Sequence, residues 1–329
     1  MLAKGEKILV VGSLNANEDD REYHRGQMKT VQIFDGEKFE HIPYFDGKGE
    51  LGVSSFAWKS DQAMQWYYSS GSDLRLLDLA NQQELDLKVP KLRGVHEIDI
   101  LKNQLWVSNT YFNEILEYDV LNQEVKQRIK LLSSKEKFKN LDESEINPED
   151  TVKENSYHCN QIFLSYEQEL FALVHHVNGE QMVKRVAQRL LKSQGNGGVL
   201  SLQNGETKRL KLKAPHSVRK VDSNYWVFDS GHAQLNVYDK SWQLKQEVPM
   251  AGWGRGGVWV RSSNTFFAGV SKKRKRYLAF NEQNAGKNLI QGFNMNCQEV
   301  FQIEVPDVEQ LNNLYLISEE QYKALKSLS

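Results

Sequence analysis

Apolar and polar residues alternate along most of this chain in a short unit that recurs about six times. Each copy has one alternating run, a joint of two to five polar residues with Asp, Asn or Gly, and a second alternating run. Side chains alternate between the two faces of a strand, and such joints favour tight turns, so each copy predicts a β-hairpin. The hairpins begin at Thr30, Leu74, Leu116, Val199, Leu235 and Phe293.

A further apolar run that ends in small polar residues precedes most hairpins. These runs read ILVVGS, QWYYSSG, LWVSNT, LFALVHH, YWVFDSG and FFAGVS. Strand, strand and hairpin at a nearly constant period predict an all-β fold, a six-bladed β-propeller with one repeat in each blade. One domain is expected over residues 1–329, with blades at 6–45, 51–90, 92–132, 156–214, 215–250 and 251–306.

Three segments depart from the repeat. The lone apolar run NNLYLIS at 312–318 is expected to complete the N-terminal blade, because a ring closed in this way leaves no unpaired strand edge. Residues 133–155 are charged and poor in large apolar side chains, which predicts an inter-blade loop or a short surface helix. Apolar residues at helical spacing predict an inserted helix near 180–192, acting as a lid, an oligomer contact or surface decoration.

The charge balance is nearly even, with 42 Lys and Arg against 43 Asp and Glu, so nothing global points to nucleic acid or an anionic membrane. The basic cluster at 271–276 lacks interleaved aromatic residues and is interpreted as a solvated loop. The chain contains no apolar run of the roughly 20 residues that a membrane helix needs, and its start lacks the pattern of a signal peptide. With two distant cysteines, we expect a soluble cytoplasmic protein with reduced thiols.

Candidate chemistry is expected where the innermost strands of a propeller enter and leave the centre of the ring. The predicted starts of these strands place several polar residues at one mouth: Ser54, Ser55, His96, Glu97, His158, Asn160, His216, Arg219 and Arg255. The ends of the second strands add Asn15, Asn109, His175, His176, Asp229, His232 and Lys272. His175 and His176 are adjacent, so alternation predicts that at most one of them faces the centre.

His96, His158 and His216 come from successive blades and are expected to share one pocket. Neutral imidazoles in such a set would suit a divalent metal such as zinc. Glu97 and Asn160 would instead supply oxygen ligands to a harder ion such as calcium. The competing interpretation is that each histidine only hydrogen-bonds to a neighbouring strand.

His216 and Arg255 are the leading catalytic candidates, together with His96 and His158. Imidazole passes protons, while guanidinium grips a carboxylate or phosphate or stabilises an oxyanion. The candidates for substrate binding are Asn160, Arg219, Asn109, Asp229 and Lys272. The alternative for an arginine is a structural tie between blades. Cys159 should face away from its two neighbours, which predicts a buried apolar role rather than a nucleophile.

Two C-terminal segments carry a resemblance to a known family. They read PHSVRKVDSNYWVFDSGHAQLNVYD from Pro215 and GWGRGGVWVRSSNTFFAGVSKKR from Gly252. They resemble a largely uncharacterised microbial propeller family with Pro-His-Ser-Pro-Arg, Leu-Trp-x-x-x-Ser-Gly, Arg-Gly-Leu and Val-Gly-Leu-Ser-Lys elements. Val218 replaces the second proline and Gly257 the leucine of the Arg-Gly-Leu turn. The architecture is also similar to the gluconolactonase, paraoxonase and strictosidine synthase group, whose metal-ligand patterns do not map onto this chain.

Two classes of function follow. The first is a hydrolase, lyase or cyclase that binds a small molecule at the mouth of the propeller channel, with or without a divalent metal. The second is a non-catalytic propeller that presents a face to another protein. Polar residues that converge on the channel favour the enzyme, whereas an exposed apolar patch on the rim would favour the scaffold.

Overall fold

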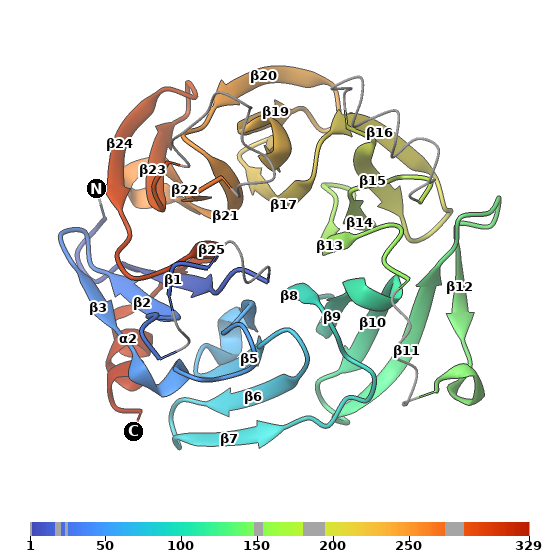
Figure 1. The fold of residues 1–329 in the computed structure, drawn as a ribbon, viewed down its shortest axis with the longest axis horizontal. Coiled ribbons are helices and arrows are strands. Elements are labelled where there is room, and N and C mark those ends of the chain that lie inside the picture. Colours follow the sequence, from blue (N-terminus) through green and yellow to red (C-terminus); the bar gives the residue numbers. More distant parts are fainter. Residues whose placement is uncertain are drawn as a thin grey trace.

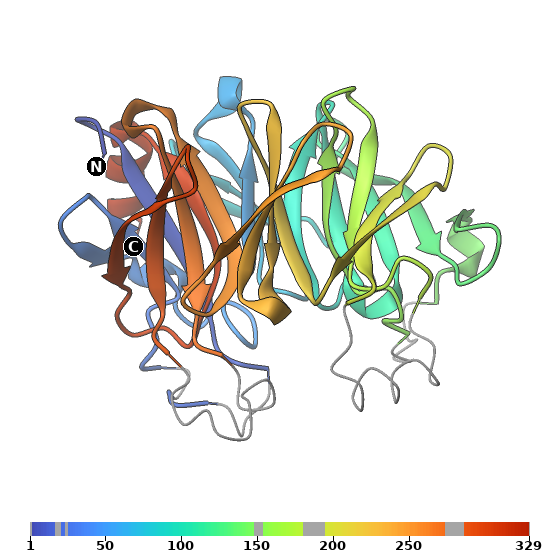
Figure 2. The same ribbon diagram turned by 90° about the horizontal axis from the view of Figure 1, so that it is seen from above.

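The computed structural model describes residues 2–16, 21–23, 26–147, 154–179, 195–273 and 286–328. Its strands form six antiparallel sheets arranged in a ring around a central axis (Figure 1). Seen from the side, the strands run across the thickness of the ring (Figure 2). The chain is therefore a six-bladed β-propeller, as the repeat predicts. The helix predicted near 180–192 lies outside the described residues.

The strands of each blade lie side by side from the axis of the ring outward. From the innermost strand, blade 1 contains β25 (Gln310–Ile317), β1 (Lys7–Ser13), β2 (Val31–Phe34) and β3 (Phe39–His41). Blade 2 contains β4 (Ser55–Trp58), β5 (Gln65–Ser69), β6 (Leu74–Asp78) and β7 (Gln83–Asp86). Blade 3 contains β8 (Val95–Leu101), β9 (Gln104–Asn109), β10 (Glu114–Asp119), β11 (Glu124–Leu131) and β12 (Phe138–Leu141).

The second half of the ring follows the same order. Blade 4 contains β13 (Cys159–Leu164), β14 (Leu170–Val174), β15 (Gly197–Ser201) and β16 (Thr207–Leu212). Blade 5 contains β17 (Pro215–Val221), β18 (Asn224–Asp229), β19 (Gln234–Tyr238) and β20 (Leu244–Pro249). Blade 6 contains β21 (Trp253–Val260), β22 (Thr265–Ser271), β23 (Leu289–Asn294) and β24 (Glu299–Glu304).

The described helices are short. They are η2 (Pro43–Phe45), η3 (Ser60–Gln62), η4 (Thr110–Phe112), η5 (Glu143–Glu145), η6 (Ser230–His232), η7 (Arg261–Ser263) and α2 (Glu319–Lys326). None of these described helices is long and apolar enough to cross a membrane.

Burial explains the two sequence patterns of a blade. The second strand of a blade packs against neighbouring blades on both faces, so β14, β18 and β22 are almost entirely apolar and buried. The outermost strands meet solvent on one face, so β7, β20 and β24 alternate or are largely exposed. The core is thus divided into apolar layers between successive blades.

The turn of the outer hairpin repeats in every blade. An Asp or Asn side chain in this turn accepts the backbone N–H of a residue two positions further along, which fixes the turn locally. The six residues are Asp35, Asp78, Asp119, Asn204, Asp239 and Asn294. The polar joints of the sequence repeat therefore have one common structural role.

The ring closes between the two ends of the chain. β25, near the C-terminus, pairs with β1 from Lys7 opposite Ile317 to Ser13 opposite Gln310, and becomes the innermost strand of blade 1. Both ends of the chain consequently lie in the same blade (Figure 1). The predicted closure is confirmed.

Two elements differ from the sequence prediction. Within 133–155, Phe138–Leu141 forms β12, a fifth strand that pairs with β11 at the outer edge of blade 3. After β25 the chain forms α2, which was not predicted although Ser318 and Gln321 make a capping box at its start. The helix packs Leu325 into the apolar layer between blades 1 and 2.

Candidate functional site

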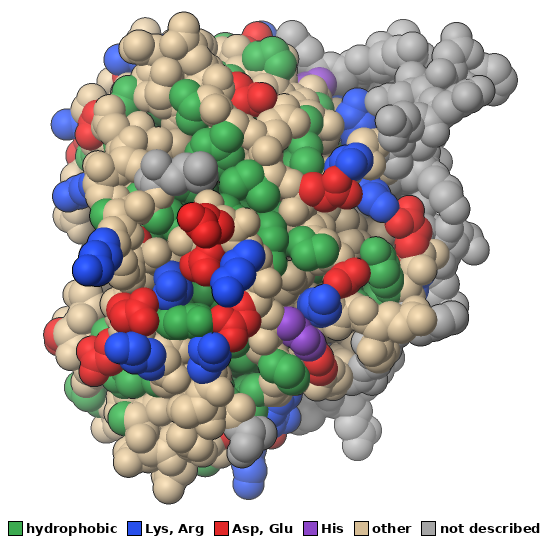
Figure 3. All heavy atoms as spheres, turned by 90° about the vertical axis from the view of Figure 1, so that its left-hand side faces the viewer, with side chains coloured by type: hydrophobic (Ala, Val, Ile, Leu, Met, Phe, Trp, Pro, Cys, Tyr) green, Lys and Arg blue, Asp and Glu red, His purple; other side chains and the backbone are tan. Residues whose placement is uncertain are grey.

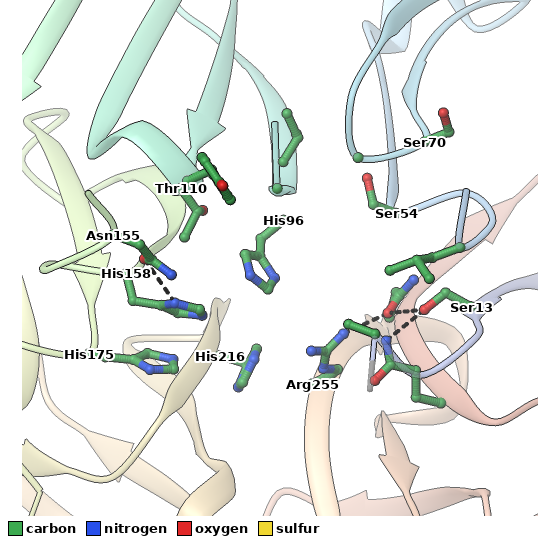
Figure 4. Close-up of a pocket in the computed structure, with 18 of the residues that line it drawn as sticks. Ser13, Ser54, Ser70, His96, Thr110, Asn155, His158, His175, His216 and Arg255 are labelled. Carbon is green, nitrogen blue, oxygen red and sulfur yellow. Dashed lines mark hydrogen bonds between the residues drawn. The ribbon is translucent and has the colours of Figure 1, made fainter. Parts of the chain in front are cut away.

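A cavity of about 840 Å³ opens where the innermost strands begin and the second strands end. Figure 4 shows His96, His158, His175 and His216 together on one side of it, with Arg255, Ser13 and Ser54 across from them. Gln310 and Asn312 of β25 also line this polar wall. The four residues predicted to be catalytic thus face one pocket.

Local backbone irregularity places these four side chains. Each of the innermost strands β8, β13, β17 and β21 has one residue more than its partner strand close to the pocket. Such a β-bulge bends the strand and changes the direction of its side chains. The bulges lie at 95–98, 159–161, 216–218 and 254–257. They lie beside or around His96, His158, His216 and Arg255.

Glycine is required where β21 meets β25. A Cβ atom on Gly256 would collide with the Asn313 side chain and backbone. The absence of a side chain next to Arg255 therefore allows β21 to approach the closing strand.

The four histidines form a closed quartet of imidazoles: His96, His158, His175 and His216. Their ring centroids are 4.9 Å apart for His96 and His158, 4.0 Å for His158 and His175, 5.5 Å for His175 and His216, and 6.1 Å for His216 and His96. His176 also lines the cavity, because β14 ends at Val174 and strand alternation no longer applies. The expectation that only one of the adjacent histidines faces inward is wrong.

Hydrogen bonds determine which nitrogen of His216 carries the proton when the ring is neutral. Its Nδ1 lies 3.0 Å from the Ala214 carbonyl and 3.0 Å from Ser230 Oγ. The Ser230 hydroxyl donates its proton to the Gly254 carbonyl, so towards His216 it is an acceptor. Nδ1 therefore carries the proton, and Nε2 is the basic nitrogen of the neutral ring.

His158 is held in the same way. Its Nδ1 lies 3.0 Å from Asn155 Oδ1, which can only accept, so Nδ1 of His158 is the donor (Figure 4). Two neighbouring histidines therefore share one tautomer with a basic Nε2.

His175 differs from His158 and His216, because its partner donates a hydrogen bond to the ring instead of accepting one. Asn160 Nδ2 donates to His175 Nε2 over 2.8 Å and to the Pro215 carbonyl over 2.5 Å. Burial, followed by the charges of His158 and His216, holds the pKa of His175 well below its usual value. His175 is accordingly a neutral, fixed member of the quartet.

Arg255 stands on a wall of neutral hydrogen-bonding groups. Its Nη1 donates to Asn312 Oδ1 over 2.7 Å, and Asn312 Nδ2 donates to the Val53 carbonyl over 2.9 Å. Ser13 donates to Asn312 Oδ1 and accepts from Gln310 Nε2. The side chain of Arg255 is thus oriented within the cavity by an amide network from the closing strand.

The positions of the donor atoms bear on metal ligation. Among the described residues, no three His, Cys, Asp or Glu side chains are arranged to hold a metal ion. Several imidazole nitrogens of the quartet also have protein partners already. Zinc or calcium binding by His96, His158, His216 or Glu97 stays a prediction.

Glu97 and Arg219 are placed differently from their prediction, in the interior of the ring rather than on the cavity wall. Arg219 Nη2 lies 2.7 Å from Glu97 Oε1, and Ser217 Oγ donates to Glu97 Oε2 over 2.7 Å. Gln161 and Asn313 also donate to Glu97. We call Glu97, Gln161, Ser217, Arg219 and Asn313 the axial network.

The axial network connects all six blades. Arg219 donates to the Gly257 carbonyl of blade 6, and Asn313 of blade 1 donates to the Tyr315 hydroxyl. That hydroxyl bonds with Ser55 of blade 2. Arg219 therefore acts as the structural tie that was the alternative interpretation of the arginines.

The other predicted substrate-binding residues do not line the cavity. Asn109 and Asp229 end equivalent strands in blades 3 and 5, where each accepts a backbone N–H from the segment before the innermost strand. Lys272 pairs with Glu22 over 2.6 Å, and Asn160 holds His175. These four residues have partners within the protein, and their role in substrate binding stays a prediction.

Cys159 is confirmed as a buried apolar residue. It lies in the layer between blades 3 and 4, and burial raises the pKa of its thiol to about 12. A thiolate nucleophile is therefore disfavoured at this position.

Sequence reasoning missed the residues that position the candidates. They are Ser230, Asn155 and Asn312, and no motif of the sequence indicates that Asn155 or Asn312 holds another side chain. Only the end of β18 gave a signal, since the run VFDSG places Ser230 directly after a strand that points at the pocket.

The comparisons with known proteins support the fold. No protein-family model and no curated protein matches the chain. A protein of unknown function from Bacteroides caccae has 12% identity and a TM-score of 0.58, over 95% of this chain and 99% of that one. A putative 6-phosphogluconolactonase from Bacteroides fragilis has 8% identity and a TM-score of 0.54, over 96% and 99%.

A chain from a nidogen/laminin complex is also similar, with 9% identity and a TM-score of 0.55, over 95% of this chain and 98% of that one. Similarities at such identity show the fold alone. Proteins of similar fold thus include one described as a putative 6-phosphogluconolactonase and one from a nidogen/laminin complex. Function must therefore be argued from the cavity.

Proposed function

We propose that this protein is an enzyme that acts on a small anionic molecule by general acid–base catalysis in the cavity at the mouth of the propeller. His216 is the proton acceptor, Arg255 holds an anionic group, and His96 and His158 are further proton-transfer groups. The reaction class is that of a hydrolase, lyase or cyclase. The observation that carries the proposal is a histidine with a fixed basic Nε2 in the same cavity as a buried arginine.

The cavity suits a small molecule. Its volume of about 840 Å³ lies within the usual range of ligand pockets, and Tyr111 and Trp253 add aromatic surface to the polar walls. His216 and Trp253 lie with ring centroids 5.8 Å apart, so an apolar face adjoins the proposed base.

The side chains favour acid–base over covalent catalysis. Ser230 donates to a carbonyl, Ser54 donates to the Ser69 carbonyl, and Ser13 donates to Asn312. Each hydroxyl is thus committed as a donor to another acceptor rather than to a histidine, and Cys159 lies in the core. Imidazoles can instead remove a substrate proton or activate water.

The test uses His216→Asn and Arg255→Met. Asn retains a donor near the Nδ1 position but cannot act as the base, and Met retains much of the volume of Arg without its charge. We expect both variants to melt near the parent temperature and to lose binding or turnover in a panel of small carboxylates and phosphates. His41→Asn is the matched control, because His41 lies at the surface and pairs with Asp46.

Destabilisation of both variants with ligand binding intact would contradict the proposal, because a structural histidine or arginine leaves buried partners unsatisfied at a cost of about 1–3 kcal/mol. The scaffold alternative has less support. The exposed large hydrophobic side chains of the described residues lie on four different blades: Leu85, Leu121, Leu244 and Val300. The face shown in Figure 3 mixes charges of both signs rather than presenting an apolar patch.

A further inference from the structure

The Nε2 atom of His175 accepts a hydrogen bond from Asn160. It lies 2.8 Å from Asn160 Nδ2, and the same Nδ2 lies 2.5 Å from the Pro215 carbonyl oxygen. A carbonyl can only accept, so the atom of Asn160 at this position is the amide nitrogen and acts as a donor. Nε2 of His175 is consequently the acceptor, and the proton of this ring lies on Nδ1.

The Nδ1–H group of His175 is left for a ligand. The two nitrogens of an imidazole point away from each other, and Asn160, which takes Nε2, is buried in the wall behind the ring. His175 itself lines the cavity beside His158 and His216 (Figure 4). Within the described part of the chain, no group makes a hydrogen bond with Nδ1 of His175. The ring therefore offers one fixed donor to the cavity.

A β-bulge places Asn160 behind His175. The register of β13 with β14 shifts between Cys159 and Gln161, so Asn160 is the extra residue. Its side-chain nitrogen makes two hydrogen bonds, whereas its buried Oδ1 has no partner among the described residues. A buried oxygen without a partner is unfavourable, so the two donor bonds determine how this amide is oriented.

The donor on His175 and the base on His216 are complementary and close. His216 has its proton on Nδ1 and a basic Nε2, whereas His175 has an acceptor-bonded Nε2 and a donor Nδ1–H. Their ring centroids are 5.5 Å apart, so one small group of a substrate can contact both. Asn160 also links the two rings, because Pro215 directly precedes His216.

Resting on the proposed function, we propose that His175 is a further catalytic residue, the hydrogen-bond donor to a carbonyl oxygen of the substrate, and that Asn160 is its positioning residue. The substrate class is then a small carbonyl compound that also has the anionic group held by Arg255.

Two reactions of the proposed class place negative charge on this oxygen. In one, His216 Nε2 takes a proton from the carbon next to the carbonyl, the C–H electron pair forms a C=C bond, and the π pair of the carbonyl moves to oxygen. In the other, His216 takes a proton from water, the water oxygen bonds to the carbonyl carbon, and the same π pair moves to oxygen. A fixed N–H donor stabilises the oxyanion in both.

Long-range ¹H–¹⁵N NMR spectra of the histidine rings test the tautomer. His175 should have its proton on Nδ1. His41 is the internal control with a proton on Nε2, because that atom lies 2.9 Å from the Asp46 carboxylate. In Asn160→Asp the new carboxylate can only accept, so the proton of His175 should move to Nε2. A proton on Nε2 of His175 in the parent would overturn the proposal.

Pyruvate and propionate are matched probes, because pyruvate has a carbonyl where propionate has a methylene group. By calorimetry, pyruvate should bind the parent about tenfold more tightly, as one added hydrogen bond allows. His175→Leu and Asn160→Asp should remove this preference. His175→Asn should retain most of it, because the Asn amide nitrogen can take the position of Nδ1. A merely structural His175 would not distinguish the two probes.

Equal binding of the two probes to the parent, no binding of either, or an unchanged preference in His175→Leu would overturn the donor role. The proposed function would still stand after such a result if His216→Asn and Arg255→Met lost ligands of the wider panel. Both would fall if those two variants were destabilised and kept their ligands.

Discussion

Arg219 and Arg255 lie on the innermost strands of neighbouring blades, yet they belong to two different kinds of polar cluster. Arg219 donates to Glu97, Asn313 and backbone carbonyls of Val218 and Gly257, all within or beside the axial network. Arg255 donates to the neutral amide of Asn312 and lines the cavity. The same residue type therefore ties blades together in one region and faces a ligand space in the other.

This difference shows how polar residues with a structural role can be distinguished from candidate functional residues near the centre of the ring. In the axial network, charge meets opposite charge, and the carboxylate of Glu97 accepts from several donors. Around the cavity, the described hydrogen-bond partners of Arg255, His158 and His216 are neutral amide, hydroxyl and carbonyl groups. Basic side chains that converge on one cavity, rather than polarity alone, mark the candidate site.

The largest expected effect is on the axial network. Arg219→Met should lower the free energy of unfolding by about 3–5 kcal/mol, because it leaves the buried Glu97 carboxylate without its counter-charge. Arg255→Met, in the neighbouring blade, should cost much less. Urea denaturation of both variants measures the contrast. Equal losses in the free energy of unfolding would show that the two arginines have the same structural role.

A pH-dependent effect of comparable size is expected at Asp99, two residues after Glu97 in β8. Burial, with the Glu97 charge adding to it, raises the pKa of Asp99 to about 7. The folded state therefore keeps a proton that the unfolded chain releases above its ordinary pKa of 3.8. This contribution to stability is full below about pH 4 and declines by at most about 1.4 kcal/mol per pH unit up to pH 7.

Asp99→Asn removes that titration. The variant should gain stability over the parent as pH rises from 4 to 7, with a constant difference above pH 7. Parallel unfolding curves across this range measure the difference. A gap that does not change with pH would show that Asp99 is ionised in the folded protein.

The smallest effect on stability is expected at Ser230, with a larger effect on His216. Ser230→Ala should cost about 1 kcal/mol. Because a hydrogen bond from Nδ1 is stronger when the ring is charged, its loss should lower the pKa of His216, which NMR titration measures. Ser230→Thr should restore the pKa. An unchanged pKa in Ser230→Ala would show that the Ala214 carbonyl alone holds the ring.

The sequence repeat was sufficient to predict the blades and their closure, because alternation and turn residues are local signals. It also placed His96, His158, His216 and Arg255 at one mouth, since each stands at the start of an innermost strand. It did not separate Arg219 from Arg255. That separation depends on bulges, which turn Arg255 towards the cavity, and on the distant Glu97 and Asn313, which capture Arg219.

The sequence analysis missed β12 and α2 for similar reasons. Pairing of β12 with β11 depends on an edge that the chain makes available only after blade 3 has formed, and its four residues carry little pattern of their own. The capping box at Ser318 was readable, but the apolar positions of α2 are too few to show helical spacing in eight residues.

Closure by β25 also has a consequence for biosynthesis. Gln310 and Asn312, which hold the wall that orients Arg255, lie in the strand that a ribosome adds after all the other described strands. Asn313 of the axial network follows directly. A nascent chain that still lacks these residues has every histidine of the quartet but neither a finished wall nor a closed ring. Chains that end before β25 are therefore expected to be inactive, and the cavity becomes competent only after this strand has left the ribosome.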